Sequence, residues 1–92
     1  MIPAHQVIPD AIAAILRNAP LTAAKVDFAW RTAVGGGVDR VTAVDLRDGI
    51  LHVRAKDAAW QREIERSAGL IRARLDRLLG AAVVRGLNVT VS

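Results

Sequence analysis

The sequence has no cysteine and no tyrosine, and aromatic residues make up only 3% of its 92 residues. The absence of cysteine excludes disulfide bonds, cysteine-ligated zinc and thiol catalysis together. No apolar run approaches the roughly 18 residues that a membrane helix needs. The first six residues lack the basic and apolar regions of a secretion signal. These absences predict a cytoplasmic protein with no membrane partner and no metal site.

Residues that could carry out catalysis are few and scattered. The two histidines, His5 and His52, have no acid fixed beside them by sequence spacing. The glycine run 35–37 does not follow a strand or end in Gly-Lys-Ser/Thr, so we interpret it as a helix stop and flexible connector rather than a phosphate loop. Nucleophile motifs are likewise absent around the three hydroxyls considered as nucleophiles, Thr32, Thr42 and Ser67. We therefore expect a binding module, not an enzyme, with no catalytic residue, cofactor or small-molecule substrate.

The charge of the chain is concentrated in its second half. Thirteen basic and nine acidic side chains give a net charge of +4. Residues 1–53 balance to zero, and residues 54–92 carry eight basic and four acidic side chains, or 8 − 4 = +4. Such asymmetry indicates a polyanionic partner, but a solvated helix face with internal ion pairs explains it equally well. The excess of arginine over lysine and the alanine-rich composition suggest a GC-rich bacterium.

Two short helices are expected before residue 40. The first, over residues 9–17, has three aliphatic residues at helical spacing: Ile12, Ile15 and Leu16. Thr22 is a suitable N-cap for the second. The apolar face of this second helix consists of Val26, Ala29, Trp30, Ala33 and Val34. The position of Trp30 on that face predicts core packing rather than base stacking.

A β-hairpin follows, because the β-rich runs 41–47 and 50–56 are joined by Asp48-Gly49, a strong two-residue turn signal. Alternation along the strands directs one set of residues to the core: Val44, Leu46, Leu51, Val53 and Ala55. The same alternation turns outward His52, Arg54 and Lys56.

Residues 58–79 predict one long helix with Asp57 as N-cap and Gly80 as C-cap. Its apolar stripe consists of Trp60, Ile64, Ala68, Ile71, Leu75, Leu78 and Leu79. Residues 83–91 predict a final half-buried strand whose inward set is Val83, Leu87, Val89 and Val91.

The pattern predicts an α+β fold in the order α-α-β-β-α-β, with a three-stranded sheet and helices packed on one face. Residues 1–92 form a single domain in this interpretation, and residues 1–8 are a loose N-terminus.

A basic surface is the strongest candidate site. Arg54 and Lys56 on the outer sheet face precede a cluster on the polar side of the long helix, and the full candidate set is Arg54, Lys56, Arg62, Arg66 and Arg77. Arginine suits phosphate because its planar fork donates two hydrogen bonds at once, and such contacts give affinity without base specificity. Against this, acidic residues interleave, and Glu63 can pair with Arg66. Leu70, on the same polar side, is either a docking ridge for a partner or simply an exposed leucine.

The segment 30–91 resembles the DciA family of bacterial proteins that load or operate the replicative DnaB-type helicase. The resemblance rests on Trp30 and the Val34-Gly35 helix stop, the hairpin Asp48-Gly49-Ile-Leu51-His-Val53, and Ala58-Ala59-Trp60 before Leu79-Gly80. It implies a domain similar in layout to KH modules that binds the helicase and single-stranded or forked DNA to assist helicase loading. The Gly-x-x-Gly loop with which KH domains clamp nucleic acid is absent.

Two alternatives remain open. One is a KH-like RNA-binding or ribosome-associated module, which a preference for RNA over DNA would support. The other is a protein–protein adaptor in which the arginines form a solvated face and Leu70 marks the contact.

Overall fold

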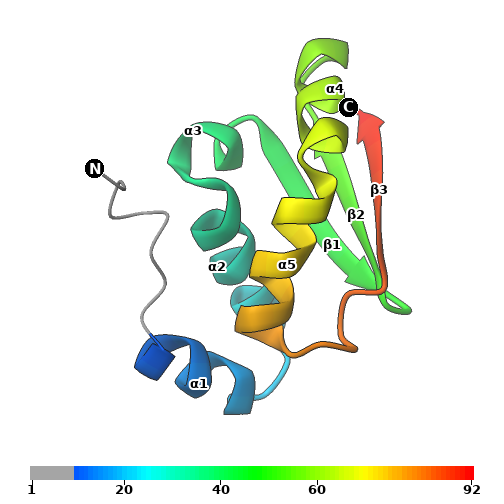
Figure 1. The fold of residues 1–92 in the computed structure, drawn as a ribbon. Helices are drawn as coiled ribbons and strands as arrows, with labels where there is room; N and C mark the ends of the chain where they lie inside the picture. The colour runs from blue at the N-terminus through cyan, green and yellow to red at the C-terminus, as the bar shows by residue number, and fades with distance from the viewer. Residues whose placement is uncertain (1–9) are drawn as a thin grey trace.

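Helices cover one face of a three-stranded sheet in the computed structural model, which describes residues 10–92 (Figure 1). The calls on residues 1–8, on Pro9 and on His5 lie outside the described residues. In chain order the elements are α1 (Asp10–Asn18), α2 (Ala23–Val34), α3 (Gly36–Asp39), β1 (Thr42–Arg47), β2 (Ile50–Ala55), α4 (Ala58–Arg66), α5 (Ala68–Leu79) and β3 (Gly86–Val91). The α+β class and the rough element order are confirmed.

The sheet has the order β1-β2-β3, with β1 antiparallel and β3 parallel to the central strand β2. Asp48 and Gly49 both have positive φ, 52° and 79°, as the predicted two-residue hairpin turn requires. The Arg85 side chain donates to the Asp48 carbonyl at 2.7 Å, and its backbone N–H donates to the Gly49 carbonyl at 2.7 Å. The hairpin turn is thus tied to the start of β3.

The core lies between the sheet and the helices. Leu51, Val53 and Ala55 are fully buried, as the alternation predicted, and Trp30 is 1% exposed. The Trp30 indole Nε1 donates to the Thr42 hydroxyl at 2.9 Å, which satisfies the one polar atom that this ring buries. Thr22 and Asp57 are N-caps as expected, because their side chains accept from backbone N–H groups three residues later.

The predicted single long helix is wrong, because it is two helices that meet at Ser67. Ser67 has φ −96° and ψ 7°, outside the helical range, and its N–H donates to the carbonyls of Glu63 and Ile64. The break lets α4 lie over β2 and β3 while α5 packs against α1 and α2 (Figure 1). The apolar stripe survives the break, with Ile64, Ile71, Leu75, Leu78 and Leu79 buried.

The glycine run is only partly the connector that we expected. Gly35 ends α2 with φ 84°, but Gly36 and Gly37 begin the short helix α3. The Arg40 N–H donates to the Gly36 carbonyl. The backbone groups of this segment therefore form hydrogen bonds within a short helix, and the segment is not extended.

The inward set predicted for the last strand is wrong at its ends. The strand starts at Gly86, and Val84, predicted outward, is buried in the preceding turn. The Arg85 bond to Gly49 fixes the strand start, so the alternation does not extend back to Val83. Val91 is 46% exposed because it lies at the end of an edge strand.

The first helix covers α5 rather than the sheet. Ala13 is buried and Leu16 packs against the core, but Ile15, expected on the apolar face, is 69% exposed because it lies on the opposite side of α1. Across residues 10–92, no helix combines the length and the apolar character needed to cross a membrane.

Candidate functional site

Three cations surround a hollow beside the end of the hairpin opposite its turn. Arg40 precedes β1, Arg54 is on β2 and Lys56 follows β2, and all three are exposed. They line a hollow of about 410 Å³ whose other walls are Val41, Thr42, Ala43 and Ser92. The antiparallel register explains why these three cations lie close together. Thr42 pairs with Ala55, so the residues that precede Thr42 and those that flank Ala55 are at the same end of the hairpin.

The charge of this cationic hollow is not neutralised by neighbouring acids. Within residues 10–92, no ion pair engages Arg40, Arg54 or Lys56, and no aspartate or glutamate lines the hollow. Exposed guanidinium and ammonium groups without carboxylate partners can donate charge-assisted hydrogen bonds to an anion. The arrangement therefore suits phosphate or carboxylate oxygens.

A second, wider groove continues from the cationic hollow across the open face of the sheet. Arg54 lines both, and the groove of about 750 Å³ also includes Arg47, His52, Asn88 and Thr90. Its one acid, Asp45, pairs with Arg47 at 2.9 Å, and both side chains are exposed. The His52 and Asn88 side chains lie 3.3 Å apart. The open face thus offers polar donors and no large aromatic side chain.

Arg62 and Arg66 lie on the exposed side of α4, one turn apart, and line neither the cationic hollow nor the open-face groove. Arg66 pairs with Glu63 at 3.0 Å, as the i,i+3 spacing predicted. This exposed ion pair holds the Arg66 guanidinium only weakly, because ion pairs at the surface contribute roughly 0–1 kcal/mol to stability. The structure therefore does not bring these two arginines together with Arg54 and Lys56.

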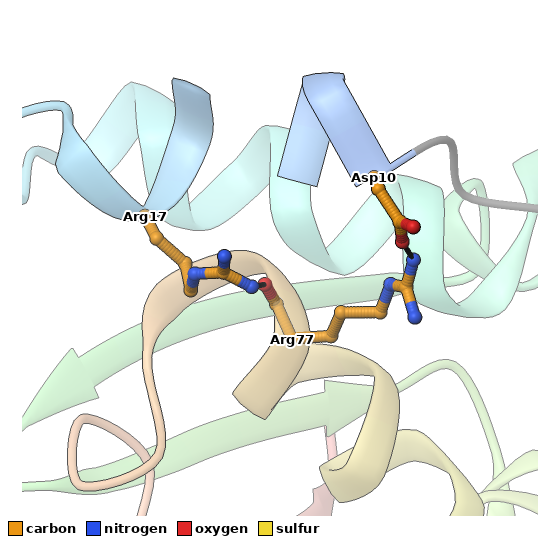
Figure 2. A network of polar contacts seen from close by, with 3 residues as sticks. All are labelled: Asp10, Arg17 and Arg77. Carbon is orange, nitrogen blue, oxygen red and sulfur yellow. Dashed lines mark hydrogen bonds and ion pairs between the residues drawn. The ribbon is translucent and has the colours of Figure 1, made fainter. Parts of the chain in front are cut away.

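Arg77 lies apart from the other candidate cations, at the contact between α5 and α1 (Figure 2). Its guanidinium forms an ion pair with Asp10, and its carbonyl accepts from Arg17 at 3.2 Å. Both interactions join the two helices. The geometry accounts for Arg77 as a helix-docking residue.

Other basic side chains bind backbone carbonyls inside the fold. Lys25, 8% exposed, donates to the Ala19 carbonyl at 2.7 Å just past α1, and Arg74 donates to Ala33 near the end of α2 at 2.8 Å. Cations near helix C-termini satisfy free carbonyls and complement the helix dipole. Arg72 and Arg85 bind the carbonyls of Val84 and Asp48. Much of the positive charge is thus structural.

Leu70 is at the rim of an apolar cavity that sequence reasoning missed. Its side chain is 57% exposed, and the cavity of about 160 Å³ lies between α2, α3, α4 and α5. The lining is mostly apolar, with Glu63 and Arg74 as its charged members, and consists of Ala33, Val34, Val38, Trp60, Glu63, Ile64, Ser67, Leu70, Ile71 and Arg74. A partly apolar recess with an exposed leucine beside it can accept an apolar side chain of a partner protein.

Arg40 is the cation of the hollow that the sequence prediction omitted. A signal for it existed, because an Asp48-Gly49 turn fixes the register of the hairpin. Extending that register past the Thr42–Ala55 pair places Val41 opposite Lys56 and Arg40 one position beyond, at the same end of the hairpin as Lys56.

Two of the three hydroxyls considered as nucleophiles, those of Thr32 and Thr42, have structural contacts. Thr32 donates to the Phe28 carbonyl at 2.8 Å, and Thr42 donates to the Val38 carbonyl at 2.9 Å. In the part of the chain that the structure describes, no cluster of three or more histidine, aspartate or glutamate side chains could hold a metal ion.

No curated protein matches the chain. The family model described as Dna[CI] antecedent, DciA, matches residues 3–89, a range that includes the helices α1 to α5, the strands β1 and β2, and most of β3. The chain therefore belongs to the DciA family.

Proposed function

We propose that this chain is a non-catalytic cytoplasmic module that contacts the DnaB-type replicative helicase and single-stranded or forked DNA, and so assists helicase loading. Family membership carries the proposal, since the DciA family is related to loading of this helicase. The cationic hollow supports the DNA contact, and the Leu70 cavity supports a protein contact.

Phosphate groups are the part of DNA that the cationic hollow suits. Arg40, Arg54 and Lys56 can each contact a phosphate oxygen, and the open-face groove next to Arg54 leaves room for the strand to continue. No large aromatic lines either surface, so affinity comes from charge rather than from stacked bases. We keep Arg62 and Arg66 as additional phosphate contacts and leave out Arg77, because its guanidinium docks α1.

The DNA contact is tested by changing Arg54 and Lys56 together to glutamine. Each phosphate contact to a single strand contributes about −0.7 to the slope of log K against log salt, so the double variant should flatten that slope by about 1.4. Arg31→Gln is the matched control, because Arg31 is an exposed cation on α2 that lines neither the cationic hollow nor the open-face groove. Fluorescence anisotropy with a labelled single strand measures both. An unchanged slope in the double variant would exclude the hollow.

The helicase contact is tested by co-elution of the chain with a DnaB-type helicase. We expect a complex with the parent chain and a loss of the complex with Leu70→Glu, which places a charge at the rim of the apolar cavity. Ile15→Glu is the control, because Ile15 is also an exposed aliphatic residue but lies on α1. Circular dichroism confirms that both variants fold. Loss of binding in the control as well would remove Leu70 from the contact.

A protein–protein adaptor is the second candidate, and the Leu70 cavity favours it. Helicase binding without any measurable binding to single-stranded or forked DNA would select this alternative. Tighter binding to RNA than to DNA of equal length would instead favour the RNA-binding module.

A further inference from the structure

The outer edge of β1 has no partner within residues 10–92. Odd-numbered residues of β1 bond to β2, because the Val41 carbonyl accepts from Lys56 and the antiparallel register alternates from there. The N–H and C=O groups of Thr42, Val44 and Leu46 therefore point away from the sheet. At the opposite edge, Gln61 on α4 donates to the Val89 carbonyl of β3 at 3.0 Å. The β3 edge is therefore partly engaged by α4, whereas within the described residues no such bond reaches the outward backbone groups of β1.

Two hollows lie along this open edge, between β1 and α2. One, of about 220 Å³, is lined mainly by apolar residues, among them Leu21, Val26 and Leu46, and also by Asp27 and Asp45. The other, of about 490 Å³, includes Phe28 and Val44. Leu21 and Phe28 are 54% and 52% exposed, so apolar surface flanks the unpaired backbone.

The hollow around Phe28 is acidic although the chain is basic. Asp27 and Asp39 line it against a single cation, Arg31. Among the described residues, neither carboxylate has an ion pair or a side-chain hydrogen bond. A cationic side chain placed here would gain two carboxylate partners and could lay its methylene stem on the Phe28 ring.

We propose that the β1 edge binds an extended basic segment of a partner protein as a fourth strand. Backbone groups of the segment pair with Thr42, Val44 and Leu46, as in other cases of strand addition. Side chains two residues apart are roughly 7 Å apart along a strand, so one can enter the apolar hollow while the next reaches Asp27 and Asp39. The segment thus carries an apolar residue and a lysine or arginine at alternate positions.

The acidic groups decide between possible occupants. A nucleic acid strand would bring phosphates against Asp27 and Asp39, and like charges repel. A second copy would bring its own Asp27 and Asp39 to the same seam. A basic segment alone complements the charge. The site shares Thr42 and Ala43 with the cationic hollow but none of its three cations, and it shares no residue with the Leu70 cavity. Its test uses a peptide, with neither helicase nor DNA, so it can fail independently of the proposed function.

The probe is an acetylated and amidated heptapeptide, Thr-Lys-Thr-Leu-Thr-Lys-Thr, whose symmetric pattern fits either strand direction. Titrated into the ¹⁵N-labelled chain, it should shift the amide signals of Thr42, Val44 and Leu46. The same peptide with glutamate for lysine should bind roughly tenfold more weakly. N-methylation of one alternate set of peptide amides should abolish binding, and N-methylation of the other set should not, because only one set faces the edge.

Variants of the chain complete the test. Asp27→Asn and Asp39→Asn should each weaken peptide binding roughly two- to fivefold, whereas Glu65→Gln, which removes an exposed charge from α4, should leave it unchanged. Equal binding of the glutamate peptide, or equal tolerance of both N-methylated peptides, would overturn the proposal. So would a dimer of the chain, seen by sedimentation, that holds the β1 edge and excludes the peptide.

Discussion

A single hydroxyl group, that of Thr42, connects three elements of this fold. It accepts from the Trp30 indole on α2 at 2.9 Å and donates to the Val38 carbonyl on α3 at 2.9 Å, while its backbone begins β1. The indole N–H is in the core, where an unpaired donor is costly. The position therefore needs a side chain that donates and accepts at once.

Thr42→Val should lower the free energy of unfolding by about 1–3 kcal/mol, because valine keeps the shape but leaves the Trp30 donor unpaired. Thr42→Ser keeps the hydroxyl and should lose less than the valine variant. Urea unfolding monitored by tryptophan fluorescence measures both. A serine variant less stable than the valine variant would show that the methyl group, not the hydrogen bond, matters here.

Gly49 and Gly36 should respond oppositely to alanine. Gly49 has φ 79°, which strains any residue with a side chain, and an added Cβ would also displace the Arg85 guanidinium that binds the Asp48 carbonyl, so Gly49→Ala should destabilise the chain by about 1–3 kcal/mol. Gly36 begins α3 with open space around its Cα, so Gly36→Ala should stabilise by about 0.4–1 kcal/mol. Thermal unfolding of the two variants side by side is the measurement. Equal effects would mean that the hairpin turn relaxes without strain.

At the scale of elements, the sequence predicts periodic patterns better than the points where they change. The hairpin was predictable because Asp48-Gly49 specifies its turn and register, and the second helix because Thr22 caps it. The break at Ser67 left no trace in the apolar stripe, because that stripe continues through it. The position at which β3 starts, after Val83 and Val84, depends on the hydrogen bond from the Arg85 N–H to the carbonyl of Gly49, which is 36 residues away in the sequence. Local sequence carries no such information.

The candidate site was predictable to a similar degree. Arg54 and Lys56 follow from strand alternation, and Arg40 from the hairpin register. The cavity beside Leu70 and the open edge of β1 depend on how helices distant in sequence pack, so no motif announces them. The KH-like layout that the resemblance implies stays a prediction.

The contact of α1 with α5 should depend only slightly on its ion pair. Arg77→Gln removes the pair with Asp10, whose side chain is almost fully exposed, and should cost at most about 1 kcal/mol. Ala13→Asp instead buries a charge at the same contact and should release α1. Hydrogen exchange of the α1 amides distinguishes the two outcomes. A flatter salt slope for DNA in Arg77→Gln would restore Arg77 to the set of phosphate contacts.

For the whole molecule, the net charge overstates what a polyanion can reach. Lys25, Arg72, Arg74 and Arg85 are bound to backbone carbonyls, and Arg17 and Arg77 hold α1 against α5. Of the exposed cations that remain, Arg40, Arg54 and Lys56 line the cationic hollow, and Arg62 and Arg66 lie on the outer side of α4. Arg47 is paired with Asp45, and Arg31 lies apart on α2. How many of these groups a DNA strand contacts is a property of the entire surface.

Changing both Arg62 and Arg66 to glutamate tests whether the strand extends to α4. If both groups are used, DNA binding weakens and the salt slope flattens by about 1.4, because two phosphate contacts are lost. The effect should add to that of the Arg54 and Lys56 double variant. An unchanged slope would confine the strand to the sheet side of the molecule.

The parallel pairing of β3 with β2 has a consequence for how the chain folds as it is synthesised. The central strand β2 leaves the ribosome well before β3, which is the last of the three strands to emerge. Until then, one edge of β2 has no neighbour, and Leu51, Val53 and Ala55 lack the lateral cover of Leu87 and Val89. Since domains fold as units during synthesis, the sheet can close only after residue 91 is free. Emergence of β3, rather than completion of the hairpin, then sets the moment at which this domain becomes able to bind its partners.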